Sequence, residues 1–189
     1  VYDNKGNAYY KDDGVRPDSS TEKLAELRPV FDKKHGNITA GNSAQITDGA
    51  SWLILASEQA VKKHNLSVMG RLVASNWAGL DPRHMGLGPV HSTIPMLNEH
   101  RLTANDIDYW ELNEAFAAQA LYCVKEANWD LDKVNLNGGA IALGHPLGIS
   151  GTRIITTLLN VMEQQEKSVG LATMCVGTGQ GITTIIKRG

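Results

Sequence analysis

A glycine-dense stretch between Asn137 and Arg153, with a single histidine near its centre, constrains the fold more than any other feature of the sequence. Its five glycines allow tight backbone turns and the close approach of other segments or of a ligand. An apolar run precedes it at 134–137, and a helical pattern begins near Gly148, so we predict a turn between a strand and a helix. Loops in such positions hold ligands in α/β sheets.

This stretch does not complete a phosphate-binding P-loop. Gly139 and Gly144 have the spacing of that motif, but His145 and Pro146 stand where it needs a lysine and a serine or threonine. The proline favours an extended backbone at His145 and so presents the imidazole at a fixed point. From this stretch alone, two interpretations stay open: a catalytic imidazole, or a histidine at a helix start that has no chemistry.

The rest of the chain reads as strands alternating with helices. We predict strands at 50–56, 68–76, 109–112, 169–175 and 181–187, and helices at 21–27, 57–64 and 91–100, from Glu114 and from Gly148. The last two strands are consecutive and joined by a glycine-rich turn, which favours an antiparallel pair. The fold class predicted is α/β, a mixed β-sheet covered by helices with a closing antiparallel strand pair.

Composition narrows the class of protein. The length of 189 residues suits one domain, and the formal charge of −2 without a basic patch argues against nucleic acid as a partner. No apolar run approaches the about 18 residues of a membrane span. Two distant cysteines make no disulfide framework, so a cytoplasmic location is the expectation. Turn-rich residues 1–37 are predicted to be a linker and the tail of a preceding region, and 38–189 the main domain.

Two further motifs decide between the interpretations of His145. Asn113–Gln119 (NEAFAAQ) is a strand-to-helix junction, and Met174–Gly181 (MCVGTGQG) is a turn between strands. Together with 137–153, in this order, they resemble the C-terminal half of the thiolases, the acyl-CoA acyltransferases. The resemblance covers nearly the whole chain, and it implies one of two similar halves that pack into a five-layer arrangement.

The resemblance also implies roles for four residues. Cys175 is similar to the acid/base cysteine, and we expect amide dipoles of the glycines behind it to lower its pKa. His145 resembles the histidine that activates the nucleophile and contributes to an oxyanion hole, and Asn113 the asparagine that holds a water there. Gly177 would let its amide point into the oxyanion position. Without the resemblance, Asn113 reads as a helix cap and Cys175 as an inert core residue.

Six residues are candidates for the substrate-binding wall. The loop Thr39–Ala44 is similar to a segment lining the acyl-CoA entrance of thiolases. On this resemblance we propose Ala40, Ser43 and Ala44 as substrate-binding residues. Many thiolases carry serine where this chain has Ala44, which puts a hydrogen bond to the pantetheine arm in doubt. Met85, in a run similar to a thiolase segment beside the thioester, is proposed as an apolar wall, and Ala115 and Phe116 complete the set. The alternative interpretations have no function: the loop Thr39–Ala44 is a tight turn, and Met85 fills a gap in the core.

The thiolase nucleophile has no counterpart in this sequence. Cys123 falls on an apolar stripe of the helix after Glu114, with Phe116, Ala120 and Ala127, and is predicted to be an inert core residue. We therefore expect that the chain begins inside a longer protein and is inactive alone. Its expected partners are acyl-CoA and CoA, an N-terminal half carrying the nucleophilic cysteine, and further copies of itself.

No cofactor is expected beyond coenzyme A as a substrate. No metal is expected, because His145 and Cys175 lack paired ligands at short spacing. A related condensing enzyme with two histidines is disfavoured by Asn113. The alternative function is a non-catalytic CoA-binding or assembly module with the same fold.

Overall fold

The computed structural model describes residues 1–12 and 14–189 and divides them into two compact units, 1–41 and 42–189. The helices and strands are α1 Thr21–Ala25, α2 Glu58–His64, β1 Arg71–Gly79, α3 Gly88–Glu99, β2 Tyr109–Leu112, α4 Ala117–Glu126, α5 Ala140–Leu143, α6 Ser150–Gln164, β3 Val169–Val176 and β4 Gln180–Lys187. Short 3-10 turns lie at η1 Ala40–Asn42, η2 Pro82–Leu87, η3 Ala104–Asp106 and η4 Leu131–Lys133.

The first unit carries almost no core. Among the described residues of 1–41, Thr39 alone is buried. The one α-helix wholly within this unit, α1, begins at an N-cap serine, Ser20, whose hydroxyl accepts the backbone N–H of Lys23 at 3.3 Å. The proposed domain division after residue 37 stays a prediction.

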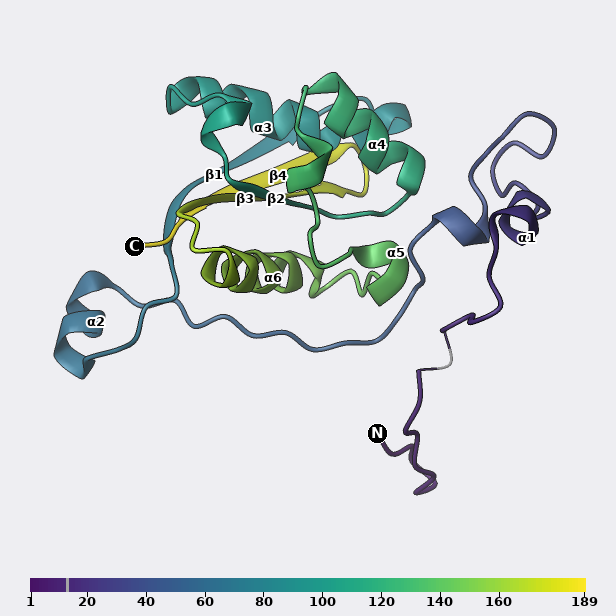
Figure 1. Cartoon of the computed structure of the whole chain (residues 1–189), viewed down its shortest axis with the longest axis horizontal. Coiled ribbons are helices and arrows are strands. Elements are labelled where there is room, and N and C mark those ends of the chain that lie inside the picture. The colour runs from purple at the N-terminus through teal and green to yellow at the C-terminus, as the bar shows by residue number, and fades with distance from the viewer. Residues whose placement is uncertain (13) are drawn as a thin grey trace. The chain divides into compact units, whose positions relative to one another are not determined.

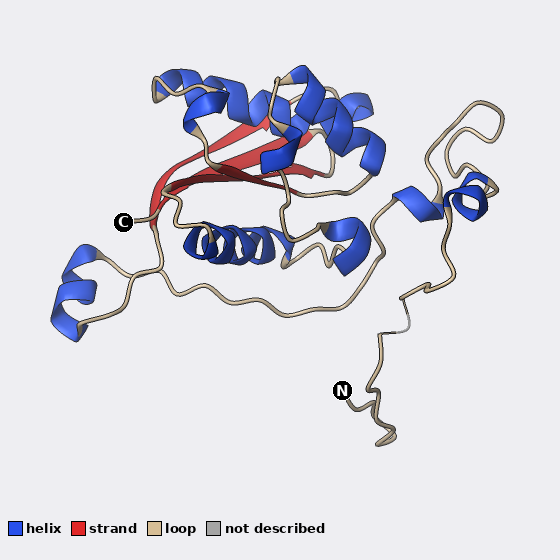
Figure 2. Cartoon of the chain, in the orientation of Figure 1, coloured by secondary structure: helices blue, strands red, loops and turns tan. Residues whose placement is uncertain are grey.

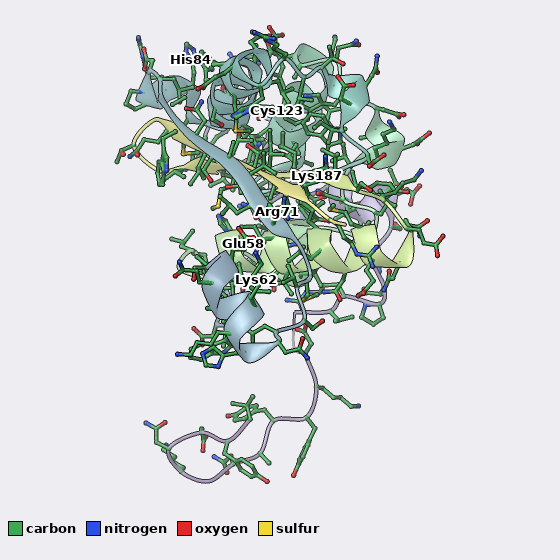
Figure 3. All side chains as sticks on the ribbon, turned by 90° about the vertical axis from the view of Figure 1, so that its left-hand side faces the viewer. Glu58, Lys62, Arg71, His84, Cys123 and Lys187 are labelled. Atoms are coloured by element: carbon green, nitrogen blue, oxygen red, sulfur yellow. The ribbon has the colours of Figure 1, made fainter. Side chains whose placement is uncertain are left out.

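The second unit is built on a four-stranded sheet in the order β1-β4-β3-β2 (Figure 1). β4 is antiparallel to both β1 and β3, and β2 is parallel to β3, so the sheet is mixed. Arg71 and Lys187 are register partners and mark the start of β1 and the end of β4 (Figure 3). The predicted mixed sheet and its antiparallel closing pair are confirmed.

Helices cover both faces of this sheet (Figure 2). α3 and α4 pack on one face over a core that includes Leu171, Cys123 and the stacked rings of Trp110 and Trp129, 4.3 Å apart. α6 covers the other face through Ile154, Leu158 and Met162, which pack against Ala172. Neighbouring residues of β3 therefore serve opposite cores, as alternation along a strand requires. The apolar residues Ile154, Leu158, Val161 and Met162 recur at the spacing that predicts a buried helix face, and this prediction is confirmed.

Two predicted strands are absent from the described residues. Residues 50–56 form no strand, and Trp52 and Ile54 are 87% and 91% exposed, so among the described residues this apolar run neither joins the sheet nor enters a core. Residues 134–137 make one bridge, Val134 to Trp110. The reason is local: Asn135 has a left-handed φ of 51°, which turns the chain away from β2.

The side chain of Asn135 then completes the edge of β2. Its Nδ2 donates to the carbonyl of Leu112 and its Oδ1 accepts the N–H of Leu112, both at 2.8 Å. An amide side chain thus replaces the strand that the sequence predicts at this edge. The strand predicted at 68–76 is displaced to Arg71–Gly79, and the helix expected from Glu114 begins at Ala117, after Phe116 as its N-cap.

Close backbone approach joins α3 to β4. A Cβ built on Gly181 would overlap the backbone of Gly88, the first residue of α3, so glycine is required at this crossing. The contact brings η2, which contains Met85, against the β3–β4 turn, where the N–H of Leu80 donates to the carbonyl of Gly179 at 2.9 Å.

Candidate active site

The motif residues Asn113 and Cys175 come together at one edge of the sheet. Asn113 follows β2 directly, and Cys175 is the penultimate residue of β3. Because β2 and β3 are parallel, their carboxyl ends share that edge, and the N–H of Asn113 continues the ladder by donating to the carbonyl of Thr173 at 3.0 Å. Asn113 is fully buried and Cys175 is 5% exposed.

A short segment, Ser43–Gln45, ties the loop of Asn113 to the loop of His145. The N–H of Ala44 donates to the carbonyl of Ala115 at 3.0 Å, and the N–H of His145 donates to the carbonyl of Gln45 at 3.0 Å. Ser43 bridges Phe116 across the same segment. The loops of Asn113 and His145 are about 30 residues apart in the sequence, and the hydrogen bonds of 43–45 fix the distance between them in space.

The imidazole of His145 is held at both of its nitrogens. Its Nε2 lies 3.3 Å from Nδ2 of Asn113, and its Nδ1 lies 2.5 Å from the hydroxyl of Ser150 at the start of α6. Oδ1 of Asn113 is buried and has no hydrogen-bond partner among the described residues. The pairing thus brings together two residues that the sequence placed in different motifs, with one acceptor left for a further donor.

Burial and a neighbouring cation keep His145 neutral. Desolvation lowers its pKa below the usual 6.5, and the positive charge of Arg153 lowers that pKa further. Arg153 faces Glu111 on β2, with Nη1 and Oε2 3.5 Å apart. Burial raises the pKa of Glu111 to about 8 against the pull of Arg153. Because Glu111 is then largely protonated at pH 7, it leaves the guanidinium charge uncompensated beside His145.

The two cysteines both have raised pKa values. Burial raises the pKa of Cys175, and a backbone hydrogen bond offsets only part of this effect. The expectation that glycine amides would lower this pKa is therefore wrong for the chain as it stands, since desolvation outweighs the dipoles. Burial raises the pKa of Cys123 to about 11. Cys123 lies between α4 and the sheet (Figure 3), within 3.2 Å of the carbonyl oxygen of Gly86.

The turn after β3 leaves its first glycine open. Gly177 is exposed, and a Cβ there would meet no atom within 4 Å. Gly179 differs, since its φ is +86° and a Cβ would overlap the carbonyl of Leu80. The glycine required by packing is therefore Gly179, and the expected direction of the Gly177 amide stays a prediction.

Comparison with known proteins places this geometry in a family. The model of the thiolase C-terminal domain matches residues 66–188, and that of the thiolase N-terminal domain matches residues 1–59. The chain belongs to the thiolase family. The chain is 54% identical over 180 residues to a 3-ketoacyl-CoA thiolase of Vibrio cholerae, covering 94% of this chain and 46% of that protein. It is 53% identical to the 3-ketoacyl-CoA thiolase of Pseudoalteromonas atlantica, with 94% and 47% covered. It spans about half the length of these curated relatives.

Solved thiolases share the fold. Human mitochondrial 3-ketoacyl-CoA thiolase in complex with CoA aligns with a TM-score of 0.85 at 41% identity, over 93% of this chain and 44% of that one. The dimeric peroxisomal thiolase of Saccharomyces cerevisiae gives 0.88 at 41% identity, over 100% and 48%. The acetyl-CoA acetyltransferase of Bacillus anthracis gives 0.89 at 40%, over 95% and 45%. The predicted thiolase-like half is confirmed.

The remaining candidates of this thiolase chain lie apart from the imidazole contacts. Met85 is half-buried in η2, and Ala115 and Phe116 are half-buried between β2 and α4. Ser43 and Ala44 are half-buried in the segment that ties the motifs, and Ala40 is exposed at the end of the first unit. Their roles toward a substrate stay predictions.

Sequence reasoning missed two polar groups of the site. Ser150 contacts the imidazole; the signal was a serine five residues after His145, one helical turn beyond Pro146. Glu114 accepts Nδ2 of Asn135 at 2.9 Å and the N–H of Ile141 at 3.2 Å, and so anchors the loop that leads to His145. An acidic residue directly after Asn113 at a strand end could have indicated it.

Among the described residues, no group of three or more His, Cys, Asp or Glu side chains is arranged to hold a metal ion. Within the same residues, no helix has the length and apolar character to cross a membrane.

Proposed function

We propose that this chain supplies the acid/base and oxyanion-hole residues of a thiolase that transfers acyl groups between CoA thioesters. The reaction is Claisen condensation or thiolytic cleavage of a 3-ketoacyl-CoA, as in an acetyl-CoA C-acyltransferase, with coenzyme A as substrate and no further cofactor. The single observation that carries the proposal is the 3.3 Å pairing of Asn113 Nδ2 with His145 Nε2 across two motifs.

In this proposal, His145 and Asn113 act on one thioester. The neutral imidazole, with its lowered pKa, is the form that accepts a proton from a nucleophilic thiol. Once protonated, the imidazolium donates to the thioester oxygen as negative charge develops there. The unpaired Oδ1 of Asn113 gives a water one acceptor beside the same oxygen.

Cys175 exchanges the proton of the α-carbon. Its raised pKa favours the thiol at neutral pH, and a thiol is the form that protonates the α-carbanion released by thiolysis. The resulting thiolate is the base for the reverse, condensing direction. Gly177 is proposed to direct its amide to the second thioester oxygen, and the open space at its Cα leaves room for that substrate.

The substrate wall is proposed to comprise Ser43, Ala44, Met85, Ala115 and Phe116. The support is the tie between Ala44 and Ala115, which connects two of these segments directly, and the contact of η2 with the β3–β4 turn. The small side chains of Ser43, Ala44 and Ala115 are half-buried, and small side chains in a wall leave room for a slender pantetheine arm.

The nucleophilic cysteine is proposed to come from an N-terminal half. Neither cysteine of this chain suits that role, because Cys123 is buried in the core with a strongly raised pKa and Cys175 has the acid/base position. We further propose a cytoplasmic enzyme that is a homo-oligomer; the yeast relative is described as dimeric.

The test compares the 189-residue chain with a completed enzyme, in which this chain follows the N-terminal portion of the Vibrio cholerae relative. Thiolysis of acetoacetyl-CoA is followed in both. We expect turnover by the completed enzyme and none by the chain alone above its Cys175→Ala control. Turnover by the chain alone would place the nucleophile within it. CoA binding without turnover by a folded completed enzyme would instead favour the non-catalytic module.

A further inference from the structure

The protons around His145 follow from the partners of Ser150. The Ser150 hydroxyl lies 2.5 Å from Nδ1 of His145 and donates to the carbonyl of Pro146 at 3.1 Å. A carbonyl only accepts, and a hydroxyl has one proton, so a hydroxyl that donates to Pro146 offers a lone pair to Nδ1. In that arrangement Nδ1 carries the hydrogen.

The other side of the ring requires the same tautomer. Nδ2 of Asn113, which only donates, faces Nε2 at 3.3 Å, and Nε2 must therefore accept. The opposite tautomer would require both that Asn113 turn its amide over and that Ser150 release the carbonyl of Pro146. Two independent partners thus agree on a neutral ring with its hydrogen at Nδ1 and its lone pair at Nε2.

We infer that Ser150 is a positioning residue that sets the tautomer of His145 and so leaves Nε2 as the base for the nucleophilic thiol; this rests on the proposed thiolase function. In the step, the S–H bond of the thiol breaks and an Nε2–H bond forms, and both electrons of the S–H bond stay on sulfur. The ring becomes an imidazolium with hydrogens on both nitrogens. Its Nδ1–H bond to Ser150 is then charge-assisted and stronger.

The charged groups nearest the ring do not replace this role. Arg153 on α6 is a cation and cannot accept from Nδ1, and Glu111 on β2 faces Arg153 at 3.5 Å. The Ser150 hydroxyl, at the point where helix α6 begins, is therefore the acceptor for the hydrogen of Nδ1 in this geometry.

Removing the Ser150 hydroxyl should leave the fold intact. The carbonyl of Pro146 keeps two other donors, the N–H groups of Ile149 and Ser150, each at 3.0 Å. Ser92 on α3 gives a matched control: it is also 0% exposed, and its hydroxyl also bonds a carbonyl four residues earlier, that of Gly88 at 3.0 Å. Ser92 makes its side-chain contacts with Thr183 and not with His145.

The experiment measures kcat, KM and the pH dependence of thiolysis in the completed enzyme with Ser150→Ala, Ser150→Thr and Ser92→Ala. For Ser150→Ala we expect kcat to fall on the order of 10- to 100-fold with little change in KM, less than the loss of a general base itself. The acid limb of the pH profile of Ser150→Ala should move to lower pH, because the imidazolium of His145 loses the acceptor of its Nδ1 hydrogen and the pKa of His145 falls. Ser150→Thr, which keeps a hydroxyl, should retain most of kcat, and Ser92→Ala should leave kcat and the pH limb unchanged.

A second measurement needs no substitution at Ser150. Nitrogen-15 NMR of the histidine-labelled completed enzyme at about pH 8, with His145 assigned by its loss in His145→Ala, should show a protonated Nδ1 and an unprotonated Nε2. A protonated Nε2 would overturn the inference, as would wild-type kcat in a folded Ser150→Ala enzyme or an equal loss in Ser92→Ala. An inactive wild-type completed enzyme would instead overturn the proposed function, and the NMR result would still decide the tautomer.

Discussion

Replacing Glu111 with glutamine should remove the pH dependence that this buried carboxyl gives to the free energy of unfolding. The Glu111 side chain is 2% exposed, and Nη1 of its partner Arg153 is 3.5 Å away, while Nη2 of Arg153 has no hydrogen-bond partner in the described part of the chain. The weak contact explains why desolvation prevails and raises the pKa from 4.5 to about 8. Glutamine keeps the shape but cannot ionise.

The sign and size of the effect follow from this pKa. Below pH 4.5 Glu111 is protonated in both the folded and the unfolded chain, and its contribution to the free energy of unfolding is fully present. As pH rises toward about 8, the unfolded chain loses the proton first, so the free energy of unfolding falls. At about 1.4 kcal/mol per pH unit, the total is on the order of 5 kcal/mol, of which little is screened at such burial.

The assay is thermal unfolding of the completed enzyme at about pH 5.5 and about pH 8.5, for wild type, Glu111→Gln and Glu163→Gln. Glu163 is the control, since it is 60% exposed and its contact with Arg188 is 3.4 Å long. We expect Glu111→Gln to gain stability over wild type at the higher pH and Glu163→Gln to follow wild type at both. The reasoning would be refuted if the stabilities of wild type and Glu111→Gln changed equally with pH, or if Glu111→Gln lost more stability than wild type at the higher pH. The second result would show a stable ion pair between Glu111 and Arg153.

Two further predictions concern the chemistry. In the completed enzyme, Cys175→Ala should abolish hydrogen–deuterium exchange at the acetyl-CoA methyl, while acyl exchange between CoA molecules remains. Cys123→Ala should lower mainly the free energy of unfolding, by about 1 kcal/mol. Methyl exchange that survives in Cys175→Ala and vanishes in Cys123→Ala would show that the acid/base role belongs to Cys123. The acid limb of the pH profile of kcat/KM should lie below pH 6.5, because burial and Arg153 lower the pKa of His145. Arg153→Gln should move that limb to higher pH. An unmoved limb in a folded variant would show that Arg153 does not lower the pKa of His145.

The sequence by itself determined the elements whose pattern is repeated and local. β2 occupies Tyr109–Leu112 as predicted, and the apolar spacing of Ile154, Leu158 and Met162 predicted the buried face of α6. Two consecutive strands around a glycine turn predicted the antiparallel pair, because a short turn permits little else. The resemblance of the motifs to those of the thiolases predicted that His145 and Asn113 act together, and the two side chains lie 3.3 Å apart.

Tertiary structure decided what depends on partners distant in the chain. The apolar run 50–56 has strand composition and forms no strand, because a strand exists only beside another strand's edge. Burial raised the pKa of Cys175 where local amides suggested the opposite, since desolvation is set by everything packed around a group. The acceptor of the His145 Nδ1 hydrogen likewise came from the packing of a turn against a helix start, which no periodicity in the sequence encodes.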